Sequence, residues 1–249
     1  WFMVFAPAKT PQPIIEKLNL ALRKALDTPA VKERMVKDGF DPIVARSAEL
    51  LVAQLDRFEK LLEDLLEVSR FDAEVAVLEA VDFDMVQLVQ RCADDLGLVA
   101  KERKTQIYVN STEPVIMIKA DIRRVERILR NLMANAIDHS EEMQIDVRIV
   151  ASEHDVAVGV RDYGIGLDEN ALNRVFDRFW RADPSRARTR GGTGLGLSIA
   201  LEDARLHNGE LEAWGRPGRG SHFVVTLPRN TWESIEARLI KLQPEDYRA

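Results

Sequence analysis

Apolar residues recur at helical spacing in several long stretches of the chain, and shorter alternating stretches lie between them. Residues 47–71 show the most regular pattern, in which apolar side chains follow a four-three repeat. Its members are Leu51, Leu55, Phe58, Leu62 and Leu65. This repeat predicts one helix of a bundle or coiled coil, and Leu61 and Leu66 widen its apolar face. We expect the charged side chains between them to face solvent: Asp56, Arg57, Glu59, Lys60, Glu63 and Asp64.

The segment before this helix, residues 1–46, predicts a short strand followed by two helices. The apolar run at residues 1–5 is the strand, and the pairs Thr10-Pro11 and Thr28-Pro29 each open a helix. Proline is tolerated there because the first N–H of a helix is unpaired anyway. Nothing in this segment has the residue pattern of a catalytic site.

The part after it, residues 72–230, alternates between short strand patterns and long single helices. A linker leads into the first of seven predicted strands, which are 75–83, 105–110, 115–118, 143–150, 156–161, 211–214 and 223–227. A turn at 110–114 separates the second and third strands. Strands in hairpins combined with single helices predict an α+β fold. We expect a two-layer α/β sandwich, with helices on one face of a mixed, mainly antiparallel sheet.

Three helices are predicted in the same part of the chain. The first is capped by Asp82 or Asp84 and runs to about residue 104, and the second is capped by Asp121. The third covers 195–207 and ends at an Asn-Gly pair. Regular periodicity is lost from 163 to 194. The tail from Thr231 predicts one short amphipathic helix.

Composition narrows the classes of function. The 249 residues, with 46% hydrophobic and 31% charged side chains, suffice for one large or two small domains. A net charge of −6 argues against a dedicated nucleic-acid binder. No apolar run reaches the roughly 20 residues of a membrane helix, and no basic region precedes the opening apolar run, so no signal peptide is expected. The single cysteine, Cys92, excludes an internal disulfide, fits a reducing compartment and is expected to be a core residue.

The first candidate chemical motif lies on the predicted helix after Asp121. Asn131 and Asn135 are four residues apart and share one helix face, with Arg124 and Arg127 on a nearby stripe. A neutral amide oxygen can bind Mg²⁺ without cancelling its charge, which leaves the ion free to bridge phosphates. Alone, the pair also fits two ordinary polar residues on a helix surface.

The second motif follows a predicted strand. Asp162 comes at the strand end and is followed by Gly164 and Gly166. An ionised carboxylate there can accept a hydrogen bond from an exocyclic amine such as that of adenine, and glycines let a planar base approach the backbone. The alternative is a tight turn, in which this pattern is common.

The third motif is a loop with four glycines in six residues, 191–196, immediately before a helix. Its N–H groups and the helix N-terminus favour phosphate. It matches neither a Walker A loop nor a Rossmann fingerprint. A flap between the second and third motifs carries six arginines, most of them expected to be solvated: Arg174, Arg178, Arg181, Arg186, Arg188 and Arg190. We expect Phe176, Phe179 and Trp180 to pack the flap against the domain.

Together, in this order, the motifs resemble the N, G1, F and G2 boxes of sensor histidine kinases, within the Bergerat-fold (GHKL) ATPases. The N box is Asn131-x-x-x-Asn135, the G1 box Asp162-x-Gly164-x-Gly166, the F box Phe176-x-x-Phe179 and the G2 box Gly192-x-Gly194-x-Gly196-Leu197. The resemblance covers about 47–230. The amino-acid sequences of residues 124–131, 183–186 and 201–207 are similar to those of the actinobacterial MtrB-type kinases.

The resemblance implies an ATP site with Mg²⁺. It implies that Asn135 binds the metal, that Asp162 reads adenine and that the 191–196 loop holds phosphates. It makes Asn131 and Arg127 the catalytic candidates. The residues it implies for cofactor binding are Asn131, Asn135, Asp162, Gly164, Gly166, Phe179, Arg181, Gly192, Thr193, Gly194, Leu195, Gly196 and Leu197.

Related ATPases of the chaperone, gyrase and mismatch-repair type carry a Glu where this chain has Asn131. A carboxylate can activate water, whereas an amide cannot accept that proton. The sequence therefore favours transfer of the γ-phosphoryl group to a side chain over rapid hydrolysis of ATP.

The phosphoacceptor expected of a histidine kinase is not found. The usual neighbourhood is His-Glu-x-x-Thr/Arg-Pro on the first helix of a dimerisation hairpin, and the histidines at 139, 154, 207 and 222 all lack it. The helix at 47–71 resembles the second helix of that hairpin. In place of the first helix, residues 1–46 resemble the C-terminal part of the Bug-type solute-binding proteins of tripartite tricarboxylate transport. The chain therefore resembles a chimera.

We accordingly expect four parts: a solute-binding-protein-like segment at 1–46, a hairpin helix at 47–71, an ATP-binding catalytic domain at 72–230 and a tail at 231–249. The leading hypothesis is a histidine protein kinase domain that transfers phosphate to a histidine outside this sequence. The alternatives are a non-catalytic nucleotide-binding or interaction module, and a solute-binding protein based on 1–46 alone. Expected partners are ATP, an acceptor hairpin, a response regulator and a second copy through 47–71, without nucleic acid. The expected location is the cytoplasm, as the catalytic part of a normally membrane-anchored sensor.

Overall fold

The computed structural model describes residues 77–181 and 193–244, together with single positions and short runs between 17 and 71. Two compact units are distinguished, Trp1–Lys60 and Leu61–Ala249. In the first unit Lys17, Leu20, Ala21 and Lys24 are helical, as expected for the first predicted helix. The predicted strand at 1–5 and the predicted helix opening at Thr28-Pro29 lie outside the described residues, apart from a bend at Thr28.

The predicted helix at 47–71 is confirmed at its described positions. Residues 58, 61–62, 64–67, 69 and 71 are all helical. Within the second unit, three apolar side chains of this helix are exposed: Leu62, Leu65 and Leu66. They belong to the apolar face that the four-three repeat predicts.

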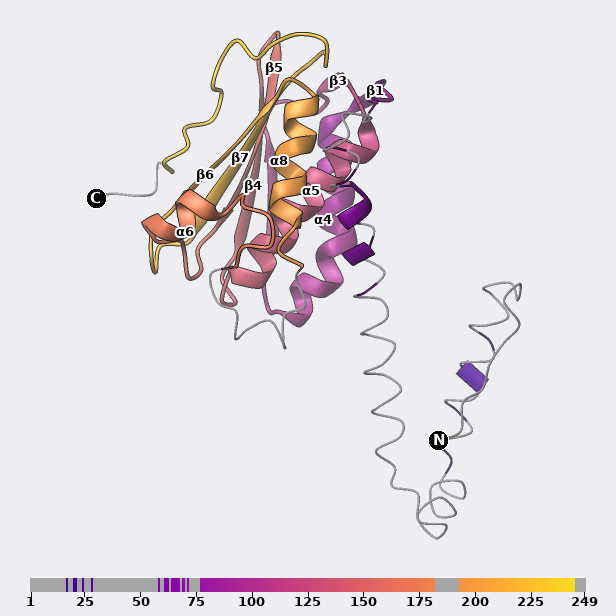
Figure 1. Cartoon of the computed structure of the whole chain (residues 1–249), viewed down its shortest axis with the longest axis vertical. Coiled ribbons are helices and arrows are strands. Elements are labelled where there is room, and N and C mark those ends of the chain that lie inside the picture. The colour runs from indigo at the N-terminus through magenta and orange to yellow at the C-terminus, as the bar shows by residue number, and fades with distance from the viewer. Residues whose placement is uncertain are drawn as a thin grey trace. The chain divides into compact units, whose positions relative to one another are not determined.

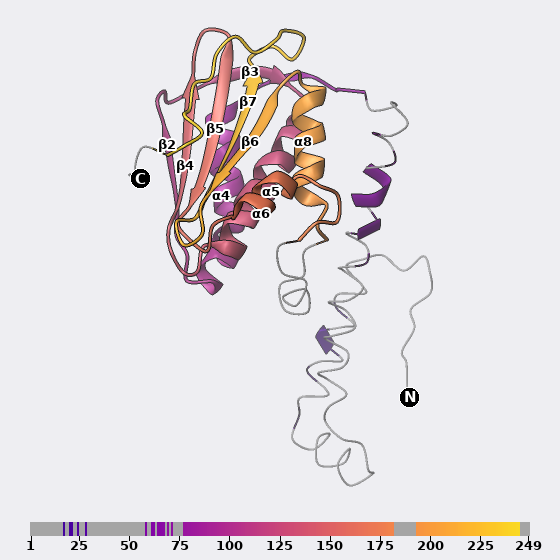
Figure 2. The same cartoon turned by 60° about the vertical axis from the view of Figure 1, so that its left-hand side comes forward.

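The second unit contains a five-stranded sheet with the strand order β2-β4-β5-β7-β6 (Figure 2). Its strands are β2 (Ile107–Ser111), β4 (Ile145–Ala151), β5 (Asp155–Asp162), β6 (Glu210–Gly215) and β7 (Ser221–Pro228). All neighbours pair antiparallel except β2 and β4, which are parallel. The predicted mixed, mainly antiparallel sheet is therefore confirmed.

Strands β1 (Val81–Asp84) and β3 (Met117–Ala120) form a separate two-stranded sheet. The predicted strands at 105–110 and 115–118 therefore do not pair as a hairpin. The reason lies at Asp84, whose carboxylate accepts the N–H of Ile116 at 3.0 Å, while the N–H of Met85 bonds the Ile116 carbonyl at 2.8 Å. These bonds hold β3 beside β1, and β2 pairs with β4 instead.

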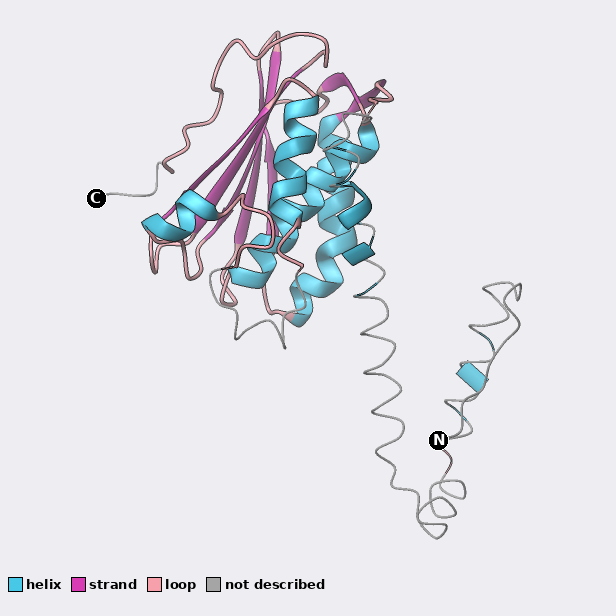
Figure 3. Cartoon of the chain, viewed as in Figure 1, coloured by secondary structure: helices cyan, strands magenta, loops and turns pink. Residues whose placement is uncertain are grey.

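Three long helices cover one face of the large sheet: α4 (Met85–Glu102), α5 (Ile122–His139) and α8 (Gly196–Leu206) (Figure 1, Figure 3). Asp84 caps α4 by accepting the N–H of Val86, and Asp121 caps α5 by accepting those of Arg123 and Arg124. These caps satisfy N–H groups that have no partner within the helix. Both caps agree with the sequence pattern.

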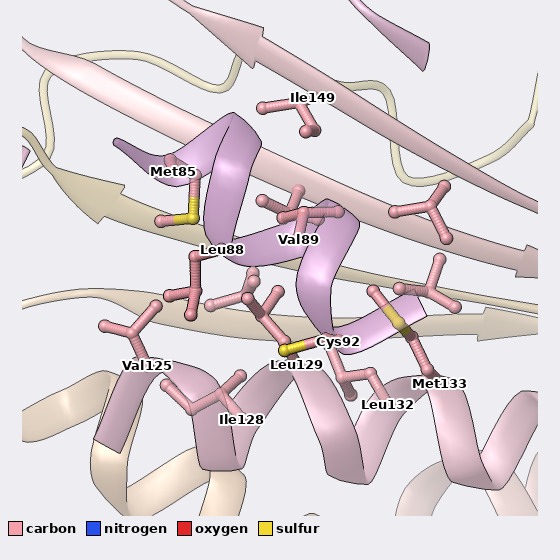
Figure 4. Packing of buried hydrophobic residues seen from close by; sticks show 14 of the residues in the cluster. Met85, Leu88, Val89, Cys92, Val125, Ile128, Leu129, Leu132, Met133 and Ile149 are labelled. Atoms are coloured by element: carbon pink, nitrogen blue, oxygen red, sulfur yellow. The ribbon is translucent and has the colours of Figure 1, made fainter. Parts of the chain in front are cut away.

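The core lies between these helices and the sheet. Figure 4 shows Leu88, Val89 and Cys92 of α4 packed between Leu129 of α5 and the sheet residue Ile149. Cys92 is fully buried, which confirms it as a core residue, and burial raises the pKa of its thiol to about 11. The thiolate is thus disfavoured at neutral pH.

The C-terminal tail runs along the opposite face of the sheet (Figure 1). Leu239, Ile240 and Leu242 pack against Ala157 and Val224. Residues 231–244 form no helix, so the predicted amphipathic helix is wrong. An extended tail instead follows the sheet, because the Asp155 carboxylate at the start of β5 accepts the N–H groups of residues 236 and 237.

Where the sequence showed no periodicity, a short helix, α6 (Glu169–Arg174), occurs. Asp168 caps it by accepting the N–H of Ala171 at 2.7 Å. Six residues are too few to show a helical repeat of apolar positions, so the sequence did not predict this helix. Among the helices in the described part of the chain, none combines the length and the apolar character needed to cross a bilayer.

Candidate nucleotide site

The N-box helix α5 and the start of α8 meet at Asn131 and Gly196. A Cβ placed on Gly196 would lie 2.9 Å from Asn131 Oδ1. A side chain at Gly196 would therefore push against the amide of Asn131. The structure thus brings together two candidates that are far apart in the sequence, one from the N box and one from the G2 box.

Asn131 and Asn135 lie one turn apart on α5, and both are half-buried. Their neighbours Leu132, Met133 and Ala136 are buried in the core. The two amides therefore flank the core-facing stripe of α5, where they remain accessible, as their shared helical face predicts.

Asp162 is the last residue of β5, and its carboxylate is almost completely buried. One oxygen accepts the N–H of Gly164 at 3.0 Å. The other accepts the N–H of Ser221 at 3.3 Å and the hydroxyl of Ser221. The sequence did not indicate Ser221, because it comes from β7, 59 residues further along the chain.

The two glycines after Asp162 are required by close backbone contacts. A Cβ on Gly164 would lie 1.8 Å from the carbonyl oxygen of His139, at the end of α5. A Cβ on Gly166, which has φ of +72°, would lie 1.8 Å from the carbonyl oxygen of Arg216. The G1 turn is therefore wedged between α5 and the β6–β7 turn, and neither position has room for a side chain.

A backbone hydrogen bond joins the F box to the G2 box. The N–H of Phe179 bonds the carbonyl of Gly194 at 3.0 Å. Phe179 has φ of +61°, which is unusual for a residue with a side chain. Residues 182–192, including Gly191 and Gly192, lie outside the described residues, as do the flap arginines Arg186, Arg188 and Arg190.

The aromatic residues of the flap divide into two groups. Phe176 meets Phe223 edge to face with ring centroids 6.3 Å apart, and Trp180 packs on the core, as predicted. Phe179 is 57% exposed, so its predicted packing against the domain is wrong. Its ring is left accessible to a ligand.

A cluster of charged residues surrounds Arg127. Its guanidinium bonds both carboxylate oxygens of Asp203 on α8, at 2.7 and 2.8 Å, and Glu67 at 2.8 Å. Arg124 donates to Asp203 Oδ1 at 2.9 Å, which is the oxygen that Arg127 contacts at 2.8 Å. Burial opposes the charge of Arg127, but its hydrogen bonds to Asp203 and Glu67 and their negative charges outweigh burial and raise its pKa.

The sequence missed Asp203 as a partner of Arg127. Asp203 is fully buried and follows Ile199 and Ala200 on the core-facing stripe of α8. A charged residue on such a stripe indicates a buried partner, and that signal was present in the sequence.

The G2 box also contacts the preceding helix. Thr193 donates a hydrogen bond from its hydroxyl to the Asp64 carboxylate at 2.8 Å, and that hydroxyl accepts the N–H of Leu195 at 3.3 Å. The prediction that Asp64 faces solvent is therefore wrong. Its helix lies against the G2 loop, so part of the predicted polar face is in contact with protein.

The remaining candidates have different positions. Leu195 is fully buried, and Leu197 packs against the core, so both anchor the start of α8. Arg181 is half-buried. Leu195 and Leu197 therefore hold the end of the G2 loop to the core.

Two family models match parts of this chain. Residues 120–231 match the family described as histidine kinase-, DNA gyrase B-, and HSP90-like ATPase. Residues 1–65 match the tripartite tricarboxylate transporter family receptor. The second match ends inside the helix predicted at 47–71.

The sensor histidine kinase MtrB of Mycolicibacterium paratuberculosis is 49% identical over 226 residues, which cover 88% of this chain and 40% of that protein. The sensor histidine kinase MtrB of Mycobacterium leprae is 48% identical over the same shares. The chain thus spans about 40% of the length of these relatives. The alignment of 226 residues is longer than the stretch 47–230, over which the sequence resembles histidine kinases, so it extends beyond that stretch.

Two solved structures show the same architecture. Full-length ShkA in complex with AMPPNP has a TM-score of 0.65 and 26% identity, over 74% of this chain and 38% of ShkA. The histidine kinase ThkA in complex with the response regulator TrrA has a TM-score of 0.64 and 20% identity, over 89% of this chain and 64% of that chain. The second likeness concerns the fold alone.

Fold, site and matches define an ATPase domain of the histidine kinase, DNA gyrase B and HSP90 class. Within that class, the chain belongs with the sensor histidine kinases and contains their ATP-binding catalytic domain.

Proposed function

We propose that this domain binds ATP in the space between the G1 turn, the N-box face of α5 and the G2 loop. The observation that carries the proposal is the buried Asp162 carboxylate, beside glycines that have no room for side chains. A carboxylate held in this way can accept a hydrogen bond from the amine of adenine and so favour adenine over guanine. Phe179, Arg181 and Gly192–Leu197 would border the nucleotide, with the N–H groups at the start of α8 toward the phosphates.

We propose that Asn135 holds Mg²⁺ together with the ATP phosphates. Its amide is half-buried on the same face as Asn131. Mg²⁺ is commonly bound through one or two protein oxygens, substrate phosphates and water, and an amide oxygen suits that role. The ion would neutralise charge on the phosphates, while Asn131 orients the reacting groups without acting as a base for water.

The γ-phosphoryl group would pass to a histidine outside this sequence. The buried His207 bonds Asp121 and Asp203 through its two ring nitrogens. His222 is buried on the tail side of the sheet, where a ring nitrogen contacts the Leu242 carbonyl. His154 lies at the far end of β5, roughly 25 Å of strand from Asp162. His139 has its carbonyl against Gly164, which places it beneath the G1 turn.

Nucleotide binding tests the first part of this proposal. Calorimetry with ATP and Mg²⁺ should give saturable binding for the parent chain. Asp162→Asn should weaken it by tenfold or more, roughly 1.4 kcal/mol. An amide keeps only one acceptor oxygen, so it cannot accept from Gly164, Ser221 and the adenine amine as the carboxylate can. Asp177→Asn is a matched control, since Asp177 is an exposed acid paired with Arg174. Absence of ATP binding by the parent chain would refute the proposal.

Transfer in trans tests the second part. The chain is mixed with a separate acceptor-hairpin protein and labelled ATP, and labelled phosphohistidine is the expected product. Asn131→Asp should raise ATP hydrolysis relative to transfer, because a carboxylate can accept a proton from water. Labelling absent from the hairpin despite ATP binding would contradict a kinase function.

That outcome would support the second candidate, a non-catalytic nucleotide-binding module. The contacts of Arg127 with Glu67 and of Thr193 with Asp64 favour this second function. Arg127 and Thr193 are candidate site residues, and both are already bonded to the helix that precedes the domain. A response regulator is the proposed downstream partner, since ThkA, which has the same fold, was solved with one. Under either function the proposed division stays 1–46, 47–71, 72–230 and 231–249, with self-association through 47–71.

A further inference from the structure

Arg161 lies next to Asp162 on β5 but on the other face of the sheet. Val156, Val158 and Val160 of this strand belong to the core beneath the helices, and Ala157 packs under the tail. Because side chains alternate along a strand, Asp162 points to the helix side and Arg161 to the tail side. Arg161 is nevertheless 7% exposed, which is rare for an arginine and indicates a built environment.

The guanidinium of Arg161 gathers three backbone carbonyls. One nitrogen donates to the carbonyl of Asp162 at 2.8 Å and to that of Ser221 at 3.2 Å, and the other donates to that of Arg219 at 2.8 Å. These carbonyls belong to the G1 turn and to the β6–β7 turn. The planar fork of an arginine suits such a set of acceptors, whereas an ammonium is a point charge.

Two aromatic rings hold the guanidinium in place. Its central carbon lies 4.7 Å from the ring centroid of Tyr163 and 5.1 Å from that of Trp214. The Tyr163 hydroxyl bonds Asp146 on β4 at 2.7 Å. Attraction between a cation and a ring face restrains Arg161, so its fork has a fixed direction.

Asp162 and Ser221, whose carbonyls both accept hydrogen bonds from Arg161, also contact each other through the Asp162 carboxylate. Ser221 donates its N–H and its hydroxyl to the Asp162 carboxylate on the helix side, while both residues offer their carbonyls to Arg161 on the tail side. The turns are also joined directly, since the N–H of Gly220 bonds the Gly164 carbonyl at 3.0 Å. The position of the carboxylate thus depends on how closely these two turns are held together.

We propose that Arg161 is a positioning residue for base recognition, which fixes the backbone of Asp162 and Ser221 so that the carboxylate faces the adenine amine. This inference rests on the proposed ATP function of the same site. Under this proposal a residue on the tail side of the sheet affects which base is bound, although Arg161 itself does not contact the nucleotide.

The test compares Arg161→Gln with Arg229→Gln in the full chain. Arg229 also donates to two backbone carbonyls, those of Met117 and Ser152, but near the opposite end of β5. Affinities for ATP and for GTP are measured by calorimetry, and unfolding by urea is measured alongside. R161Q should weaken ATP binding about tenfold and lower the ATP-to-GTP affinity ratio, while R229Q should leave both at parent values. Arg161→Lys should restore part of the ratio, because an ammonium can reach one of the three carbonyls.

A parent chain that binds no ATP would refute the proposed function, and the inference with it. A parent chain that prefers ATP, with an unchanged ratio in R161Q, would refute the inference alone. Equal losses in R161Q and R229Q would also overturn it, since they would indicate general loosening of the sheet. If R161Q fails to fold, Trp214→Leu decides, because it removes one ring and leaves the arginine. A lowered ratio in W214L that Trp214→Phe restores is expected, and an unchanged ratio in W214L overturns the proposal.

Discussion

The hydroxyl of Thr193, in the loop that resembles the G2 box, donates a hydrogen bond to Asp64 on the preceding helix across 2.8 Å. The contact joins residues 129 positions apart. Near it, Glu67 of the same helix pairs with Arg127 of α5. The helix at 61–71 is thus tied to both the N-box helix and the G2 loop, so changes in that helix are expected to reach the nucleotide site.

The charged cluster around Asp203 should be more important for stability than the contacts of Glu67. Asp203→Asn leaves Arg124 and Arg127 without their shared buried carboxylate and should cost about 3 kcal/mol of unfolding free energy. Glu67→Gln should cost about 1 kcal/mol, because Asp203 remains. Glu202→Gln, on the exposed side of the same helix, is the control and should change little. Urea unfolding measures all three, and equal costs for D203N and E202Q would contradict the prediction.

His207 should make stability depend on pH. Burial lowers the pKa of His207 more than Asp203 and Asp121 raise it, and Arg124 lowers it further. The unfolded chain therefore takes up a proton near pH 6.5 while the folded chain does not. Stability should be full above that pH, fall as the pH drops below it, and level off once the folded pKa is passed.

His207→Gln should reduce this loss of stability. Urea unfolding at pH 7.5 and pH 5.5, for the parent chain and the variant, measures the difference. An identical loss in both chains would show that other groups cause the pH dependence.

Two glycines should respond in opposite ways to alanine. Gly164→Ala places a Cβ against the His139 carbonyl and should destabilise the domain by about 3 kcal/mol and abolish ATP binding. Gly97→Ala, in the exposed middle of α4 with no atom within 4 Å of the new Cβ, should stabilise it by about 1 kcal/mol. Thermal unfolding and calorimetry give both values, and a tolerated G164A would contradict the described packing of the G1 turn.

The tail should contribute to stability through one apolar side chain. Ile240→Ala should cost about 2 kcal/mol, because Ile240 packs on Ala157 and Val224. Trp232→Ala should cost much less, since Trp232 is 65% exposed. Comparable costs in urea unfolding would show that the tail acts mainly through residues other than Ile240.

Local signals predicted much of this fold. The caps at Asp84 and Asp121, the end of α8 and the strands predicted at 211–214 and 223–227 depend on residues close in sequence, and all occur as expected. The separation of β2 from β3 and the extended tail depend on partners far along the chain, such as Asp84 for Ile116. Single-sequence patterns carry no record of such distant partners.

The candidate site divides in the same way. Asn131, Asp162, Gly164 and Gly196 became candidates because their spacing is chemically distinctive, and the structure brings Asn131 close to Gly196. Ser221 and Arg161 were missed as partners because each acts through the fold rather than through a motif. Asp203 was also missed, although its place on an apolar stripe indicated a buried partner. Asp64 was misassigned because a charge on a helix is usually solvated, and only packing against Thr193 changes that.

Asp162 ends a strand that is hydrogen-bonded on both sides, to β4 with Asp162 opposite Ile145 and to β7 with Arg161 opposite His222. A slip of β5 by one residue against its neighbours would turn the carboxylate to the wrong face of the sheet. A nucleotide that depends on this carboxylate can therefore bind only chains whose central three strands are fully registered. Added ATP should then act as a selective ligand for the completed sheet and raise the midpoint of unfolding in proportion to the logarithm of its concentration.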